Sequence, residues 1–201
     1  MKFINHRQNS ISDLANVPKL NGVEIDLRSN FKNLGKIHLS HDPWQTGDDF
    51  EEWLAEYKLQ NISGPLILNT KEDGLESRIL ELLATHKITN YFFLDTPMPT
   101  LIKWTHKNNI SHFALRVSAY EPVAAILNFE KMANWIWVDC FEGIPMPLEQ
   151  ISILKSKFKI CLVSPELQGK ELQEISKFKE LFCLADAVCT KKPEEWLSHF
   201  G

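Results

Sequence analysis

Two acidic residues alternate with apolar residues in the segment Gly22–Arg28, which reads Gly-Val-Glu-Ile-Asp-Leu-Arg. Because neighbouring side chains of a strand point to opposite faces, Glu24 and Asp26 share one face with Arg28. If helices cover the apolar face, the two carboxylates point into the protein, where they must be paired, protonated or bound to a cation. Paired carboxylate oxygens suit Mg²⁺ or Ca²⁺. The alternative is a half-exposed strand whose polar face is solvated.

Further ionisable side chains lie at or near the ends of other apolar segments in the first third of the chain. His6 and Arg7 end the first such segment, His41 ends another, and Lys71 ends a third. Imidazoles can transfer protons near neutral pH, and a metal ion together with cationic side chains can neutralise a phosphate. Together with the two carboxylates, this set predicts metal-assisted chemistry at a phosphate group.

Short apolar segments alternate with helical patterns along the whole chain, and these elements must position the polar residues. The spacing of Phe50, Trp53, Leu54 and Tyr57, for example, predicts one face of a helix. Alternating strands and helices favour a mainly parallel sheet, and roughly eight units of about 25 residues predict a small α/β barrel, the (β/α)8 barrel of the TIM type. The predicted strands are Lys2–His6, Gly22–Arg28, Lys36–His41, Pro65–Lys71, Tyr91–Thr96, Phe113–Ser118, Trp135–Phe141, Lys159–Ser164 and Asp186–Thr190.

An open, doubly wound sheet is the alternative fold. Neither of the glycine-rich phosphate-binding motifs that often accompany such a sheet follows a predicted strand. No linker or low-complexity stretch marks a boundary, so residues 1–201 are predicted to form a single domain. In a TIM-type barrel the active site lies at the carboxyl ends of the strands, which is where the polar residues fall.

The composition excludes several classes of protein. The chain has 201 residues, of which 44% are hydrophobic, and a formal net charge of −4. This is a globular composition without the basic excess that nucleic-acid binding requires. No apolar run has the length of a transmembrane segment, and the amino terminus turns polar too early for a secretory signal. With four cysteines and no Cys-x-x-Cys pair, we expect a cytoplasmic protein.

The order and spacing of three motifs resemble those of the glycerophosphodiester phosphodiesterase family, within the wider group that includes phosphatidylinositol-specific phospholipase C. The motifs are His6-Arg7, Glu24-Ile25-Asp26 and His41-Asp42. Asn69-Thr70-Lys71 lies where the family carries Glu-x-Lys, and residues 185–193 resemble its closing strand and Pro-started helix. The motifs cluster in the first third of the chain, whereas the barrel pattern covers all of it.

The resemblance implies hydrolysis of a small glycerol- or sugar-type phosphodiester. One histidine would take a proton from the nucleophile, and the other would protonate the leaving oxygen. The implied site residues are, as general acid and base, His6 and His41; as phosphate ligands, Arg7 and Lys71; and as ligands of Mg²⁺ or Ca²⁺, Glu24, Asp26 and Asn69.

Arg116 is a further candidate from the strand pattern itself. It lies on the opposite face of its segment from Phe113, Leu115 and Val117, so it is predicted to point inward and to bind a substrate anion. Pairing of Arg116 with an acidic side chain, Glu24 or Glu121, is the alternative.

Asn69 departs from the family pattern, because a third metal-binding Glu is expected at its position. An amide oxygen can still bind a hard cation, but one negative charge is lost. The alternative to an active enzyme is therefore a catalytically impaired barrel that binds a phosphate-containing ligand without turnover. A further alternative is an unrelated α/β barrel in which the polar strand ends serve only ion pairing.

Overall fold

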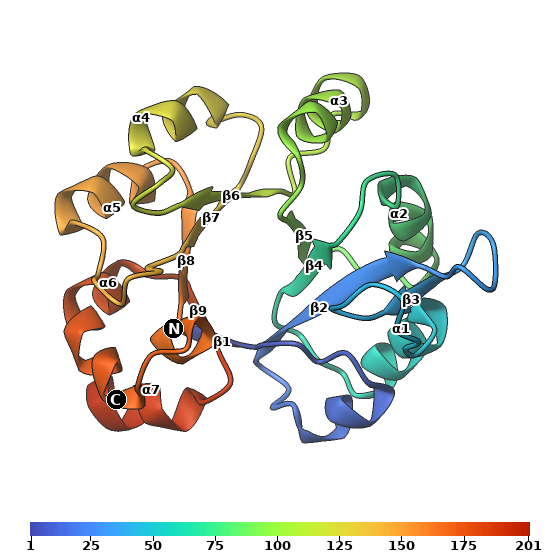
Figure 1. Ribbon diagram of the computed structural model, residues 1–201, viewed down its shortest axis with the longest axis horizontal. Helices are drawn as coiled ribbons and strands as arrows, with labels where there is room; N and C mark the ends of the chain where they lie inside the picture. The colour runs from blue at the N-terminus through green and yellow to red at the C-terminus, as the bar shows by residue number, and fades with distance from the viewer. The chain divides into compact units, whose positions relative to one another are not determined.

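The computed structural model describes residues 1–201, which form two compact units. The amino-terminal unit is Asn5–Thr100, and the carboxy-terminal unit is Met1–Ile4 together with Leu101–Gly201. In each unit the strands form the interior and the helices lie outside them (Figure 1). The first strand, β1 (Lys2–Asn5), and the third helix, α3 (Met98–Asn108), both cross the boundary between the units.

The amino-terminal unit contains most of the predicted site residues. Its elements are a 3₁₀ helix (η1, Ile11–Asn16), β2 (Gly22–Ser29), β3 (Ile37–Leu39), α1 (Phe50–Leu59), β4 (Leu66–Thr70), α2 (Glu76–Thr85) and β5 (Tyr91–Leu94). The sheet order is β5-β4-β2, with β3 paired to β2. Strand β4 runs parallel to both β2 and β5, and its Asn69 lies opposite Asp26 of β2. Two predicted site residues are thus brought together by the register of the sheet.

The carboxy-terminal unit repeats the same alternation of strand and helix. Its sheet order is β1-β9-β8-β7-β6, and the described pairs β6–β7, β7–β8 and β8–β9 are parallel. The elements are β6 (Ala114–Val117), α4 (Val123–Ile126), η2 (Leu127–Phe129), β7 (Trp135–Val138), α5 (Leu148–Lys155), β8 (Lys159–Val163), η3 (Pro165–Gln168), η4 (Leu172–Phe178), α6 (Lys179–Leu184), β9 (Ala187–Thr190) and α7 (Pro193–Phe200).

The element order is that of a (β/α)8 barrel of the TIM type, as predicted. Strand β3 is the difference. The prediction placed a strand at Lys36–His41 as one of the alternating series, but the observed strand is shorter and runs antiparallel to β2. Only residues 30–36 separate β2 from β3. A parallel return needs a connection of roughly a dozen residues or more, so this chain can only turn back as a hairpin. His41 therefore lies in the loop that follows β3.

Helix α1 is stabilised by a capped amino terminus and by a buried apolar face. Asp49 caps its amino terminus by accepting hydrogen bonds from the backbone amides of Glu51 and Glu52. The predicted apolar face is buried, and its Trp53 donates a hydrogen bond from Nε1 to the backbone oxygen of Gln8, at 3.0 Å. This bond fastens the loop after β1, which carries His6 and Arg7, to the helix layer.

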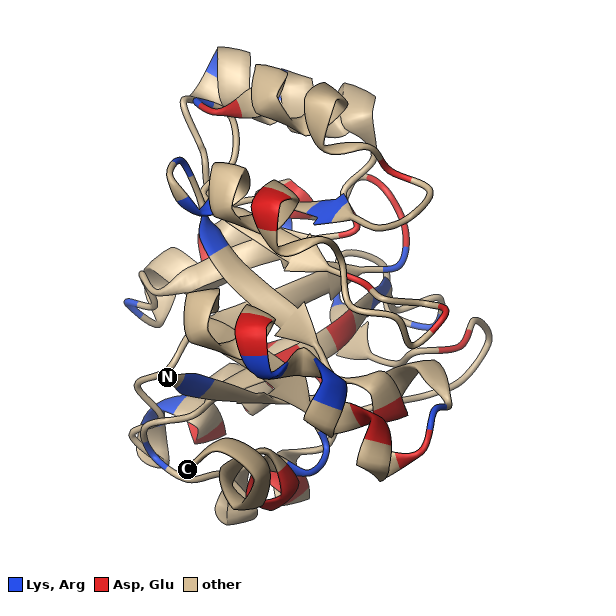
Figure 2. Ribbon diagram, turned by 90° about the vertical axis from the view of Figure 1, so that its left-hand side faces the viewer, with Lys and Arg blue, Asp and Glu red and all other residues tan.

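Figure 2 shows ribbon segments with Lys or Arg and segments with Asp or Glu in several parts of the molecule. The formal net charge of the chain is −4. None of the helices combines the length and apolar character that crossing a membrane requires.

Candidate active site

The paired carboxylates of β2 are inside the protein. Glu24 and Asp26 have 1% and 0% of their surface exposed, and the apolar residues on the other face of the strand are buried as well. Both faces of β2 are therefore covered, and the alternative of a solvated polar face is wrong. Two neighbouring buried carboxylates require protons, hydrogen-bond donors or cations, and the structure supplies hydrogen-bond donors and cationic side chains.

Asp26 is held by cationic and amide groups from the segments that follow β1 and β4. Lys71 follows β4, and its Nζ lies 3.0 Å from Asp26 Oδ1. Asn9 donates a hydrogen bond from Nδ2 to Asp26 Oδ2 at 2.8 Å and accepts one from the Asp26 backbone amide at 2.9 Å. Arg7 Nε lies 3.7 Å from the same Oδ2. Asp26 is thus a carboxylate that positions two cationic side chains at the end of β2.

Glu24 receives a different set of partners. Asn69 donates a hydrogen bond from Nδ2 to Oε1 at 3.0 Å, and the Arg7 backbone amide donates one to Oε2 at 2.9 Å. His6 Nε2 lies 3.7 Å from the same Oε2. Burial raises the pKa of Glu24 from 4.5 to about 7, and the Asp26 carboxylate adds to the rise, whereas the bonds from Arg7 and Asn69 oppose it. Glu24 therefore changes its protonation near neutral pH.

This raised pKa predicts a pH-dependent stability. Folded Glu24 keeps a proton that the unfolded chain releases, so its stabilising contribution is full below about pH 4.5 and is lost as the pH rises through 7. In the presence of a chelator, we expect the free energy of unfolding to fall by about 2–3 kcal/mol from pH 4.5 to pH 8 through this group. Urea unfolding at several pH values measures the effect. Glu24→Gln should flatten the slope, and the exposed Glu180→Gln should leave it unchanged; equal slopes in all three proteins would contradict the assignment.

The turn that carries His6 and Arg7 has an unusual backbone. Arg7 has a φ of +53°, in the left-handed region that non-glycine residues seldom occupy. Its amide nevertheless reaches Glu24, and the Gln8 amide donates a hydrogen bond to the Glu24 backbone oxygen at 2.9 Å. The turn is therefore fixed to β2 by two amides. Strained positions of this kind cluster at functional sites, where the surrounding contacts hold them in place.

His41 is attached to the same strand by its backbone. The Ser40 amide donates a hydrogen bond to the Asp26 backbone oxygen at 3.0 Å, and Arg28 donates one from Nη2 to the His41 backbone oxygen, also at 3.0 Å. His41 donates a hydrogen bond from Nδ1 to Asp42 Oδ1 at 2.8 Å. This bond holds the pKa of Asp42 below its usual value, and the Arg7 guanidinium acts in the same direction. Arg7 thus lies within electrostatic reach of the His41 loop.

Comparisons with known proteins address the fold of the chain. No family model matches the sequence, and no curated protein does. Among solved structures, a phosphodiesterase from Oleispira antarctica in complex with the product sn-glycerol-3-phosphate has a TM-score of 0.73 at 18% identity, covering 99% of this chain and 96% of that one. A predicted glycerophosphodiester phosphodiesterase from Galdieria sulphuraria has a TM-score of 0.75 at 16% identity, covering 98% and 96%. A glycerophosphodiester phosphodiesterase from Agrobacterium tumefaciens has a TM-score of 0.68 at 11% identity, covering 98% and 99%.

The chain has the fold of the glycerophosphodiester phosphodiesterases. The fold that the resemblance implied is therefore confirmed over almost the whole length of the chain. Because sequence identity is this low, the similarity establishes the fold, and the activity must be argued from the residues of the site.

The predicted metal ligands of this glycerophosphodiester phosphodiesterase fold lie together. No cluster of three or more His, Cys, Asp or Glu side chains is arranged to hold a metal ion, so the predicted site depends on an amide as its third ligand. Glu24 and Asp26 supply two carboxylates, and Asn69 would be the third ligand. Its Oδ1 is buried and has no hydrogen-bond partner, as expected of an oxygen that a cation could occupy. The three oxygen donors fit a hard divalent cation, with one negative charge fewer than three carboxylates would give.

Arg116 lies in the carboxy-terminal unit, on β6. Its Nη1 pairs with the buried Asp139, and its Nε lies 3.9 Å from Glu121 Oε1. Gln168 donates a further hydrogen bond to Asp139. The predicted pairing with Glu121 is thus observed. Binding of a substrate anion by Arg116 stays a prediction.

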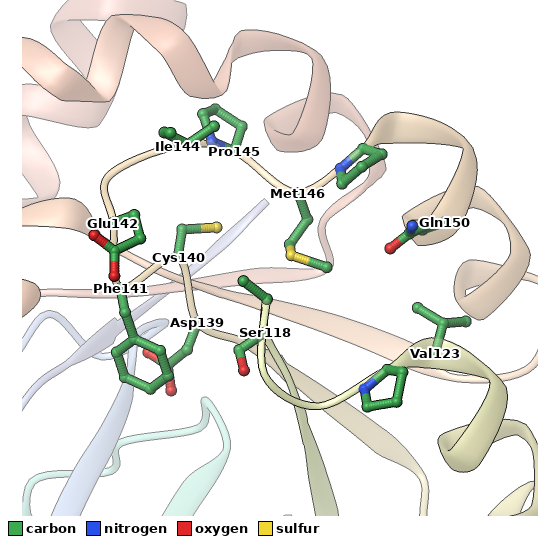
Figure 3. Close-up of a pocket in the computed structure, with 13 residues that line it drawn as sticks. Ser118, Val123, Asp139, Cys140, Phe141, Glu142, Ile144, Pro145, Met146 and Gln150 are labelled. Carbon is green, nitrogen blue, oxygen red and sulfur yellow. The ribbon is translucent and has the colours of Figure 1, made fainter.

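The carboxy-terminal unit contains a cavity of about 470 Å³ at the ends of β6 and β7. Figure 3 shows Ser118 and Asp139 on one side of it, with Met146, Val123 and Gln150 on the other. The lining is mainly apolar. Glu142 at its edge accepts a hydrogen bond from the hydroxyl of Tyr120 at 3.0 Å. This is a mainly apolar concavity at the carboxyl ends of strands, and none of the residues predicted for the site around β2 lines it.

Sequence reasoning assigned no role to two residues of the site. Asn9 bonds to both the side chain and the backbone of Asp26, which is 17 positions away. Asp42 was noted only as part of a motif, although it bonds the His41 ring. A polar residue three positions after His6 was the only available signal for Asn9, and such spacing is too common to be specific.

Proposed function

We propose that the chain hydrolyses a small glycerol- or sugar-type phosphodiester at the site formed around β2. The observation that carries this proposal is the grouping of the His6 imidazole and two cationic side chains, Arg7 and Lys71, around the buried Glu24–Asp26 pair. The loop that carries His41 is bonded by its backbone to the same strand. The complex of the Oleispira antarctica phosphodiesterase with sn-glycerol-3-phosphate supports a glycerol phosphodiester as the substrate. The comparisons do not favour a barrel that binds such a ligand without turnover.

Arg7 and Lys71 would bind the phosphate. Each is already held by Asp26, so little side-chain freedom remains to be lost when the substrate arrives. The ammonium of Lys71 has three donors and the guanidinium of Arg7 has five, so both keep donors for phosphate oxygens while contacting Asp26. Their positive charges would stabilise the negative charge that builds on those oxygens in the transition state.

His6 and His41 would transfer the protons. One imidazole accepts the proton of the attacking hydroxyl, from water or from a neighbouring hydroxyl of the substrate, as that oxygen bonds to phosphorus. The bond from phosphorus to the leaving alcohol breaks, and the other imidazole gives its proton to the departing oxygen. Attack by water yields a monoester, and attack by a substrate hydroxyl yields a cyclic phosphate. Because Asp42 holds Nδ1 of His41, the Nε2 atom is the one available for this exchange.

Mg²⁺ or Ca²⁺ would be held by Glu24, Asp26 and Asn69. When bound, the ion would neutralise charge on the phosphate oxygens. The chain would supply the oxygen ligands. Because Asn69 is neutral, the site would carry one negative charge fewer than a site with three carboxylates.

The isosteric Asn69→Asp change tests this cation site without any turnover. It should raise the affinity for Mg²⁺ or Ca²⁺ by roughly tenfold, because ligand charge is the main determinant of affinity at such sites. Calorimetric titration of chelator-treated protein measures the change. The exposed Asn108→Asp adds the same charge elsewhere and should have no effect. Equal affinity in wild type and Asn69→Asp would exclude Asn69 as a ligand.

The activity itself is tested by initial rates on a panel of phosphodiesters with Mg²⁺, Ca²⁺ or a chelator. The panel comprises glycerophosphocholine, glycerophosphoethanolamine, glycerophosphoinositol, a sugar phosphodiester and a lysophospholipid, and release of the alcohol is measured. We expect cation-dependent turnover of at least one glycerol diester. No turnover of any member with either cation would contradict the proposal.

A further inference from the structure

Three large apolar side chains are exposed close to His41, at what we call the hairpin tip (Phe31, Leu34 and Trp44). Leu34 is 96% exposed, Trp44 is 85% exposed and Phe31 is 49% exposed. The rings of Phe31 and Trp44 meet edge to face, with centroids 6.5 Å apart. Figure 1 shows the loop between β2 and β3, which carries Phe31 and Leu34, projecting beyond both strands.

The conformation of Trp44 makes its exposure harder to explain by folding alone. Its φ is +65°, in the left-handed region that a bulky residue seldom adopts. Apart from its edge-to-face contact with Phe31, this large aromatic side chain is exposed to water on a strained backbone, an arrangement that folding alone does not favour. Features of this kind persist where a function requires them, so Trp44 indicates a contact that the isolated chain does not make.

Backbone hydrogen bonds and strand pairing hold the hairpin tip beside the candidate active site. The loop is closed by backbone bonds from the Asn30 amide to the Lys36 oxygen at 2.9 Å and from the Lys36 amide to the Asn33 oxygen at 3.1 Å. Strand β3 pairs with β2, which carries the carboxylates. Trp44 follows His41 by three positions in the chain. A partner that covers the hairpin tip would therefore lie next to the loop that presents His41.

The size and charge of the hairpin tip indicate the kind of partner. A stable protein interface uses about 20–30 residues from each side, far more than three projecting side chains. Lys32 Nζ lies 5.7 Å from the centre of the Phe31 ring, and Lys36 is paired with Asp49 at 3.0 Å. With Asp42 also exposed, the surroundings have no basic excess that would select anionic lipids. Tryptophan is enriched at the boundary between headgroups and acyl chains, where an amphipathic ring fits.

We propose that the hairpin tip docks on the surface of a zwitterionic phospholipid membrane or micelle. Leu34, Trp44 and Phe31 enter the interface between headgroups and acyl chains, while Lys32 and Asp42 stay among the headgroups. Docking places the His41 loop at that surface. If the proposed function holds, the site then acts on phosphodiesters that are part of the surface or have just left it.

Vesicle binding tests the docking without any catalytic step. Large unilamellar phosphatidylcholine vesicles are titrated against wild type, Leu34→Ser, Trp44→Ser and Leu59→Ser, and bound protein is measured by sedimentation. We expect wild type to bind, and Leu34→Ser and Trp44→Ser each to weaken binding by about tenfold, because each removes one buried apolar side chain. Leu59→Ser removes a similarly exposed leucine at the end of α1 and should bind like wild type.

Three results would overturn the proposal. The first is wild type that does not bind phosphatidylcholine at millimolar lipid. The second is binding that Leu34→Ser and Trp44→Ser leave unchanged, or that occurs only on vesicles with anionic lipid and disappears in high salt. The third is self-association, seen by analytical ultracentrifugation, that Leu34→Ser abolishes while vesicles do not bind; the hairpin tip would then be a contact between two copies of the chain.

Turnover separates this proposal from the proposed function. Leu34→Ser should hydrolyse a water-dissolved glycerophosphodiester at the wild-type rate and lose activity only on vesicle-bound substrate. If wild type binds vesicles but hydrolyses nothing, docking stands and the phosphodiesterase proposal fails. If wild type hydrolyses dissolved substrate but does not bind vesicles, docking fails and the phosphodiesterase proposal stands.

Discussion

Replacing His41 with alanine should lower kcat/KM for a glycerophosphodiester by about 10²–10⁴-fold, the range expected for loss of one general acid or base. His6→Ala should lower it by a similar factor. Each variant loses one of two proton transfers, and no other imidazole among the described contacts of the site replaces it. Steady-state kinetics on the best substrate of the panel measures the loss.

The fold should survive both histidine changes. The His41 ring is partly exposed and hydrogen-bonds only to Asp42 in the described contacts, so its removal should change the free energy of unfolding by about 1 kcal/mol or less. His106→Ala, on the exposed face of α3, is the matched control and should keep full activity. Full activity in either His6→Ala or His41→Ala, with an intact fold, would exclude that residue from the acid–base pair.

Lys71→Met should destabilise the protein by about 3 kcal/mol, because it leaves the carboxylate of Asp26 buried without its closest cation. The long apolar side chain of methionine fills much of the space that the lysine stem occupied. Urea unfolding near pH 8, in the presence of a chelator, measures the difference. Binding of sn-glycerol 3-phosphate should weaken in the same variant, since the proposed phosphate ligand is lost.

A second ion pair of the same length provides the control for Lys71→Met. Lys36 lies 3.0 Å from Asp49, but both side chains are far more exposed to water than Asp26. Lys36→Met should therefore cost less than about 1 kcal/mol. Adding Asp26→Asn to Lys71→Met should recover much of the stability, because the unpaired buried charge disappears. Equal costs for the two lysines, or no recovery in the double variant, would show that Asp26 is not the buried charge that Lys71 compensates.

The carboxylate pair was predictable because strand alternation is local. Glu24 and Asp26 alternate with three apolar residues, and a short segment suffices to show that they share a face. The barrel was predictable for the same reason, because the hydrophobic periodicity within each segment predicts whether that segment forms a strand or a helix. Once helices cover the apolar face of this strand, the two acidic side chains must point into the protein.

The partners of those carboxylates were less accessible to sequence reasoning. Asn9 meets Asp26 across 17 residues, and Asn69 meets Glu24 across 45, so only the sheet register and the path of the loops decide these contacts. The β2–β3 hairpin was missed because a short apolar segment has the same pattern whether its strand runs parallel or antiparallel. The raised pKa of Glu24 depends on burial, which no sequence pattern states directly.

The most direct test of the central claim is a ³¹P NMR time course on each glycerophosphodiester of the panel. Wild type, with Mg²⁺ or Ca²⁺ present, should convert the diester signal into a new phosphorus signal, whose chemical shift distinguishes a cyclic phosphate from a monoester. His41→Ala, at the same concentration, should leave the diester signal unchanged over the same period. Conversion at equal rates by wild type and His41→Ala, or no conversion by either, would contradict a phosphodiesterase site built around β2.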